Sequence, residues 1–349
     1  MKNVKFEKGD DGNYFTYDNG NGESGYFDYR FSVEKLWHPL NPEEFIVELL
    51  INPILNRESN VYVILNSVAN KRVGYVFPIS VIDSDSDFSD YANINNYVYV
   101  AYYQLLQRIR NVKEGNTVFS ENFEENVCVC VFHRRSINVE YPLCEVIHCL
   151  RKLGYSYFEP NNSIQAVKGY DATLFLKEIK SNIRVVFKQP SLYRNPIIDS
   201  IMRFLPRADN LTHRFVLLYQ VVETLLEEIS SEKIESEIKK FRTYKIPTND
   251  FQESIKRLSS ERMRIGDIFE KCHLLDTKES IDFKDCCTKL FALVGYTPSS
   301  EKVNDLFYSF RNQMTHSYRN IYRYEKELAE TIQCFEILVM KIIESYPYD

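Results

Sequence analysis

The sequence has no long apolar run and few of the residues that interrupt regular structure. No stretch approaches the ~18–20 apolar residues that a membrane span needs, and residues 1–10 carry no apolar segment typical of a secretory signal. We therefore expect a cytoplasmic protein that makes no membrane contact. Only 11 Gly and 12 Pro occur in 349 residues, while 44% of the residues are hydrophobic and 26% are charged. This balance argues against disordered chains and repeat architectures and is typical of soluble globular proteins.

Charge excludes a second class of protein. The formal net charge is −6, whereas a protein that coats nucleic acid by bulk electrostatics needs an excess of Lys and Arg. The net charge does not exclude a local phosphate-binding site. The 25 Tyr and 23 Phe are spread over the whole chain, which favours packed cores over stacking platforms for bases.

The eight cysteines include no CxxC pair, the spacing that zinc and redox sites commonly use. Cys128 and Cys130 alternate with valines, and Cys286 and Cys287 lie in a helical pattern. Such cysteines behave as small apolar residues, so we interpret all four as core residues.

Two other groups have some features of a metal site. Cys144, His148 and Cys149 have helical spacing, but no second cluster completes four ligands. The carboxylates of residues 83–90 lie in a Ser/Asp-rich loop without the glycine and terminal glutamate of a calcium-binding loop. We expect neither a metal nor a cofactor.

The pattern of predicted elements changes near residue 190. Residues 1–190 alternate β-branched runs with helical patterns, which predicts a mixed α/β domain, and no phosphate-binding glycine loop or nucleophile elbow occurs there. Pro190 and Pro196 interrupt regular structure and mark the boundary. Residues 196–349 predict amphipathic helices joined by short loops, as in an up-down bundle. The expected fold class is therefore α+β, with an all-α C-terminal domain.

Three helix ends are predicted specifically. Asn41-Pro42-Glu43-Glu44 combines a capping Asn, a first-turn Pro and two acids, and predicts a helix that runs to about Ile51. Asn210 is the expected cap of a long helix whose apolar residues keep 3–4 spacing over residues 211–229. A further helix begins near Thr248 and is expected to continue past Leu258.

Residues able to do phosphate chemistry gather near the end of the chain, within residues 307–318. A guanidinium such as that of Arg311 clamps phosphate, and an imidazole such as that of His316 transfers protons near neutral pH. Asn312 and Tyr318 add polar groups beside them. Residues five apart on a helix point about 140° apart. Arg311 must therefore reach round, or the helix must loosen, or two copies of the helix must face each other in a dimer.

The Arg-to-His spacing alone is not specific. A second match occurs at Arg207 and His213, which straddle the predicted helix cap at Asn210, and we interpret it as a chance occurrence. What distinguishes the pair at Arg311 is the adjacent amide of Asn312 and the position on a late helix of the predicted bundle.

Residues 197–349 resemble the HEPN superfamily of helical bundles, which includes ribonuclease toxins and anti-phage defence proteins. The family motif is Arg, a polar residue, three to five residues, then His, and Arg311-Asn312-Gln-Met-Thr-His316 is similar at every specified position. The segment from residue 214 to residue 226 resembles the first bundle helix, including its Glu223. Tyr318 matches a tyrosine that follows the His by two positions in one toxin branch.

The resemblance implies metal-independent endoribonuclease chemistry at a site shared between the two subunits of a homodimer. His316 would act on the ribose 2′-OH or the leaving oxygen, and Arg311 would stabilise the charged phosphorane. Asn312 would orient a phosphate oxygen or the imidazole ring. Tyr318 would be a support or a modification target. The implied substrate is RNA. The N-terminal domain would bind a regulatory protein or a phage-derived trigger. A catalytically inactive scaffold and a nucleotide-binding regulatory module stay open as alternatives.

Overall fold

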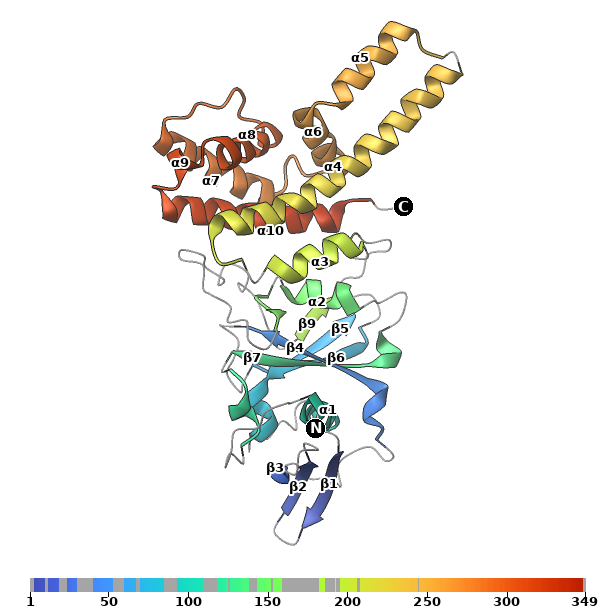
Figure 1. The fold of residues 1–349 in the computed structure, drawn as a ribbon, viewed down its shortest axis with the longest axis vertical. Coiled ribbons are helices and arrows are strands. Elements are labelled where there is room, and N and C mark those ends of the chain that lie inside the picture. Colours follow the sequence, from blue (N-terminus) through green and yellow to red (C-terminus); the bar gives the residue numbers. More distant parts are fainter. Residues whose placement is uncertain are drawn as a thin grey trace. The chain divides into compact units, whose positions relative to one another are not determined.

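The computed structural model describes residues 3–9, 12–18, 24–29, 40–52, 60–66, 70–84, 93–108, 118–124, 126–137, 143–151, 153–158, 182–185, 192, 195–205, 208–243 and 245–347. They form two units, one within residues 3–185 and one within residues 192–347. The described part of the first unit is rich in strands, and that of the second is helical (Figure 1). The fold class is α+β with a helical C-terminal part, as the sequence predicts.

The first unit contains, in its described residues, two sheets and two α-helices, α1 (Ile94–Arg108) and α2 (Leu143–Arg151). One sheet is an antiparallel meander of β1 (Asn3–Gly9), β2 (Gly12–Asp18) and β3 (Ser24–Tyr29). The other has the strand order β8-β4-β7-β6-β5-β9, and of its described pairs only β5–β9 is parallel. Its strands are β4 (Phe45–Ile51), β5 (Tyr62–Asn66), β6 (Arg72–Pro78), β7 (Val127–His133), β8 (Ser156–Tyr157) and β9 (Asn182–Val185).

Both faces of β7 are buried, which explains its uninterrupted apolar sequence. Side chains alternate along a strand, so Val129 and Val131 enter the core that contains α1, while Cys128 and Cys130 enter the core that contains α2. The two helices therefore cover opposite faces of the six-stranded sheet. The prediction that Cys128 and Cys130 are buried core residues is confirmed.

Gly74 lets β6 approach β7 closely. A Cβ atom on Gly74 would lie 2.2 Å from the carbonyl oxygen of Val131 and 2.8 Å from the ring of Phe132. Any larger residue would push the two central strands apart.

The prediction of a helix from Pro42 to about Ile51 is wrong. Asn41 does cap a helical turn, since its side chain accepts a hydrogen bond of 3.1 Å from the backbone N–H of Glu43, but that turn spans only Pro42–Glu44. The chain then enters β4, which lies between β8 and β7. Phe45 is buried on the α1 side of the sheet. Pairing with two neighbouring strands outweighs the local helix signal, because this apolar run fits a strand as well as a helix.

The second unit consists, in its described residues, of eight helices. They are α3 (Pro196–Phe204), α4 (Leu211–Arg242), α5 (Thr248–Leu258), α6 (Glu261–Lys271), α7 (Lys278–Val294), α8 (Val303–His316), α9 (Tyr318–Ile321) and α10 (Glu325–Ser345). In the part of the chain described, no helix is long and apolar enough to cross a membrane.

Five phenylalanine rings fix α8 against its neighbours. They come from α4, α7, α8 and α10, are buried, and have contacting ring centroids 5.0–5.9 Å apart. The rings are those of Phe215, Phe283, Phe307, Phe310 and Phe335. Each of these aromatic side chains removes a large apolar area from water, so the cluster holds α8 in one orientation.

The two ends of α4 differ in their surroundings. Asn210 caps its start as predicted, accepting a hydrogen bond of 2.8 Å from the backbone N–H of His213. Its last turns run alongside α5, where the rings of Phe241 and Phe251 stack with centroids 4.7 Å apart (Figure 1). The prediction that α5 continues past Leu258 is wrong. The backbone of Ser260 is extended, and a new helix, α6, begins at Glu261.

Candidate functional site

The helix α8 carries three of the predicted site residues, Arg311, Asn312 and His316, on the side that its aromatic core leaves open. Phe307 and Phe310 are buried, Arg311 and Asn312 are half-buried, and His316 is exposed. The helix is unbroken up to His316, its last residue. Of the geometries that the sequence leaves open within one chain, the structure therefore has the long arginine side chain reaching round the helix, with no loosening.

The guanidinium of Arg311 brings the predicted residues together. Its Nη1 donates to Oδ1 of Asn312 at 3.1 Å and lies 3.5 Å from Nε2 of His316. An imidazole nitrogen and an amide oxygen thus lie within 3.5 Å of the same guanidinium nitrogen. This arrangement places a fixed positive charge beside a group that can accept and donate a proton.

Glu261, the first residue of α6, completes the surroundings of Arg311. Its Oε1 lies 3.1 Å from Nε of Arg311, and both side chains are about one-fifth exposed. The N–H of Nε is not directed at this oxygen, so the contact is an ion pair rather than a hydrogen bond. The sequence did not indicate Glu261, because nothing in its local pattern connects it to a residue on a distant helix.

Tyr219 of α4 lies close to both Glu261 and Arg311. Its hydroxyl donates a short hydrogen bond to Oε1 of Glu261, and its ring centroid lies 5.7 Å from the guanidinium carbon of Arg311. Burial, followed by the hydrogen bond to Glu261, raises the pKa of Tyr219 well above its usual range. The hydroxyl therefore stays protonated and keeps donating to the carboxylate. Tyr219 was not predicted either, although its position one helical turn before Glu223 was a usable signal.

Glu223 is exposed on α4 and faces the same charge. Partial burial raises the pKa of its carboxyl, the positive charge of Arg311 opposes that rise, and the negative charge of Glu261 adds to it. In the described structure Glu223 forms no ion pair with Arg311. Two carboxylates, Glu223 and Glu261, thus share the field of one guanidinium.

Tyr318 lies apart from this group. It begins the short helix α9, and its ring centroid is 6.3 Å from that of Tyr322. Among the described residues it makes no hydrogen bond or ring contact with Arg311 or His316. The structure therefore brings together Arg311, Asn312 and His316, with Glu223 nearby, and leaves Tyr318 on the adjoining turn.

A hollow of about 520 Å³ lies beside that turn. Its lining includes two arginines, Arg319 and Arg323, and no carboxylate among the described residues. Both arginines are exposed and neither forms an ion pair within the described chain. The exposed ring of Tyr322 lies at the same hollow. Unpaired guanidinium groups beside an aromatic ring suit a phosphate backbone with a stacked base.

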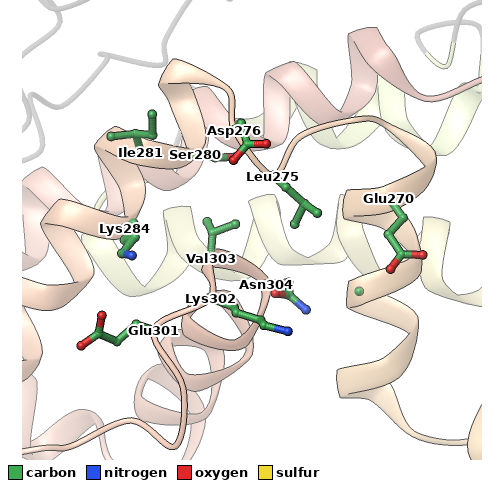
Figure 2. A pocket seen from close by; sticks show the side chains of 11 residues that line it. Glu270, Leu275, Asp276, Ser280, Ile281, Lys284, Glu301, Lys302, Val303 and Asn304 are labelled. Carbon is green, nitrogen blue, oxygen red and sulfur yellow. The ribbon is translucent and has the colours of Figure 1, made fainter.

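A second hollow, of about 530 Å³, lies at the opposite end of α8 (Figure 2). Side chains of both charges line it, among them Glu270, Lys284 and Lys302, so it has no marked preference for anions. Val303 lines it, eight residues before Arg311, which is about 12 Å along a helix. The hollow is therefore separate from the candidate site.

The second Arg–His match is not part of any site in the described structure. Arg207 lies outside the described residues. His213 is exposed, and its Nδ1 lies 3.3 Å from a carboxylate oxygen of Asp209, one turn away. Its neighbour Arg214 is buried and forms two hydrogen bonds, of 2.7 and 3.0 Å, with the buried Glu336 of α10.

Comparisons of the chain with protein-family models, with curated proteins and with solved structures found no match. Among the described residues, no group of three or more His, Cys, Asp or Glu side chains is placed to hold a metal ion. A proposal about function therefore rests on the geometry around Arg311 and on the motif in which it lies.

Proposed function

We propose that this protein is a metal-independent endoribonuclease of the HEPN type, which acts as a toxin or an anti-phage defence effector. The observation that carries the proposal is the contact of one guanidinium, Arg311, with both His316 and Asn312. The motif resemblance and the helical C-terminal unit support it. Without metal, cleavage needs a fixed positive charge at the phosphate and a proton carrier at the sugar, and these residues supply both.

The reaction would be an attack of the ribose 2′-oxygen on the adjacent phosphorus. His316 would take the 2′-OH proton as the P–O bond to the 5′-oxygen of the next nucleotide breaks. Arg311 would stabilise the extra negative charge on the phosphorane. The products are a 2′,3′-cyclic phosphate and a free 5′-hydroxyl, so DNA, which has no 2′-OH, is inert.

A second proton carrier is needed for the leaving oxygen. One chain presents one imidazole beside Arg311 in its described part, so a homodimer in which two α8 helices face each other would supply the other. The first unit would then select substrate or bind a regulatory protein or phage-derived trigger. Analytical ultracentrifugation tests the dimer, since a monomer at concentrations where RNA is cleaved would contradict a shared site.

The cleavage proposal is tested with purified protein and an end-labelled RNA whose products are mapped. We expect cyclic phosphate ends and a loss of at least about 100-fold in rate for His316→Ala and for Arg311→Ala, the range typical of a lost acid–base group. His213→Ala is the matched control, because that histidine is exposed in the same unit but lies outside the site. Equal rates for the parent, His316→Ala and Arg311→Ala would show that the cleaving activity belongs elsewhere.

The ion pair with Glu261 favours a second candidate, an RNA-binding or nucleotide-binding module without catalysis. A guanidinium that is paired with a carboxylate stabilises a phosphorane less strongly. It can still bind a phosphate when the carboxylate of Glu261 is displaced. This candidate predicts that the parent binds RNA and leaves it intact, and that Arg311→Ala weakens binding while His316→Ala does not.

A further inference from the structure

Two thiols from different helices meet at the surface of the second unit. Cys286 on α7 and Cys334 on α10 have their Sγ atoms 3.0 Å apart, about 1 Å more than a disulfide bond of ~2.05 Å. Both side chains are half-buried, so a small oxidant in solvent can reach them. A thiol pair of this kind is the precursor of a disulfide.

The other cysteines of this unit have no such position. Cys287 is buried, as predicted, and so is Cys272, whereas Cys286 is only half-buried because it lies at the edge of the stripe that α7 buries. Burial holds the pKa of the Cys287 thiol well above its usual range. A buried neutral thiol is a poor nucleophile toward an oxidant. Proximity, access and chemistry therefore single out Cys286 and Cys334.

The two thiols are also unequal. A hydrogen bond from the Cys334 thiol and the positive charge of Lys289 lower the pKa of Cys286, despite its partial burial. The hydrogen bond to Cys286, together with burial, raises the pKa of Cys334. The positive charge of Lys289 favours the thiolate of Cys286, so we assign the attack to Cys286 and the resolving step to Cys334.

We propose that Cys286 and Cys334 form a reversible disulfide that joins α7 to α10, with a peroxide or a low-molecular-weight disulfide as the oxidant. With hydrogen peroxide, the Cys286 thiolate attacks one oxygen, the O–O bond breaks, and a sulfenic acid and hydroxide form. The Cys334 sulfur then attacks the sulfenic sulfur and displaces hydroxide. The two thiol protons complete two waters, so two thiols and one peroxide give one disulfide and two waters.

The cross-link would act on the support of α8. Phe283 is one turn before Cys286 on α7, and Phe335 follows Cys334 on α10. Their ring centroids are 5.9 Å apart, and both rings contact Phe310 of α8. A covalent bond here would hold together the two helices on which the helix of Arg311 and His316 rests. The disulfide does not depend on the proposed nuclease activity.

The test uses the full-length protein, reduced, freed of reductant and treated with hydrogen peroxide or with oxidised glutathione. Remaining thiols are alkylated, the protein is digested with trypsin without reduction, and peptides are identified by fragmentation mass spectrometry. We expect residues 285–289 linked to residues 327–341 through Cys286, with Cys287 alkylated. Reduction should release both peptides.

Cys334→Ser should leave Cys286 alkylated, oxidised to its sulfenic acid or capped by glutathione, with no peptide linked to residues 327–341. Cys149→Ser is the matched control, because Cys149 is also half-buried but lies on α2 in the first unit, and it should not change the yield of the linked peptide. The proposal is overturned if both thiols of the parent are alkylated after treatment, or if the linkage runs through Cys287.

Discussion

Oε1 of Glu261 and Nε of Arg311 lie 3.1 Å apart, although α6 and α8 are separated in the sequence by the whole of α7. The same carboxylate oxygen accepts a hydrogen bond from Tyr219 of α4. The guanidinium is therefore positioned by residues of α4 and α6 as well as by residues of its own helix. A phosphate that binds Arg311 must compete with Glu261, because both anions bind the same guanidinium.

Removing that competing charge should strengthen RNA binding. Glu261→Gln keeps an oxygen that accepts from Tyr219 but loses the charge beside Arg311. An ion pair between partly exposed side chains is worth up to about 1 kcal/mol, which corresponds to about fivefold in Kd. We expect this decrease in Kd for a short single-stranded RNA, measured by fluorescence anisotropy with His316→Ala in both proteins so that the RNA stays intact.

The control for that measurement is Glu253→Gln on α5. It makes the same charge change at an exposed residue outside the site, and it should move the Kd by far less. If Glu261→Gln and Glu253→Gln strengthen binding equally, only net charge matters and Arg311 does not meet the phosphate.

The buried pair of Arg214 and Glu336 predicts a large effect on stability. The side chains are 10% and 4% exposed, and two hydrogen bonds join them. Arg214→Met alone would take the guanidinium away from the buried carboxylate of Glu336, and breaking a buried pair from one side typically costs about 3–5 kcal/mol of unfolding free energy. The double variant with Glu336→Leu should recover most of that loss. Urea denaturation followed by circular dichroism measures all three proteins, and a loss under about 1 kcal/mol for the single variant would contradict this role.

Periodicity was sufficient to predict much of the fold. The 3–4 spacing of apolar residues 211–229 located α4, because that helix buries one stripe against the aromatic cluster, and the rest of the C-terminal part is helical as predicted. The alternation of Cys128 and Cys130 with valines indicated core residues, and both cysteines are buried in β7. Local signals failed where tertiary pairing decided the outcome. The cap at Asn41 is real, yet the residues after it pair with two strands and form β4.

The candidate site was likewise only partly predictable from the sequence. Arg311, Asn312 and His316 are close in sequence, so residue types and spacing were enough to nominate them. Glu261 becomes a partner of Arg311 only because α5 stops at Leu258 and α6 begins anew after the extended Ser260. The pattern of residues along the sequence does not show how α6 packs against α8. The same holds for the thiol pair on α7 and α10, because the spacing of cysteines along the sequence does not show which helices pack together.

Oxidation of that thiol pair should stabilise the second unit. The bond between Cys286 and Cys334 would close a loop of 48 residues, for which chain entropy predicts an upper limit of about 4 kcal/mol. We expect the oxidised protein to unfold at a higher urea concentration than the reduced one. Cys334→Ser should remove the difference. Equal midpoints for oxidised and reduced parent protein, with the linked peptide present, would mean that strain in the folded state cancels the entropic gain.

The arginines beside α9 predict how RNA binding depends on salt. Arg323 is exposed, lines a hollow without carboxylates among the described residues and follows His316 by seven positions. If it holds one phosphate of a bound strand, Arg323→Ala should raise the Kd and reduce the slope of log Kd against log salt concentration by about 0.7, the value for one single-stranded phosphate. The measurement uses the His316→Ala background from about 50 to about 300 mM salt. Arg257→Ala, an exposed arginine on α5, is the control for loss of bulk charge, and an unchanged slope for Arg323→Ala would remove this hollow from the path of the RNA.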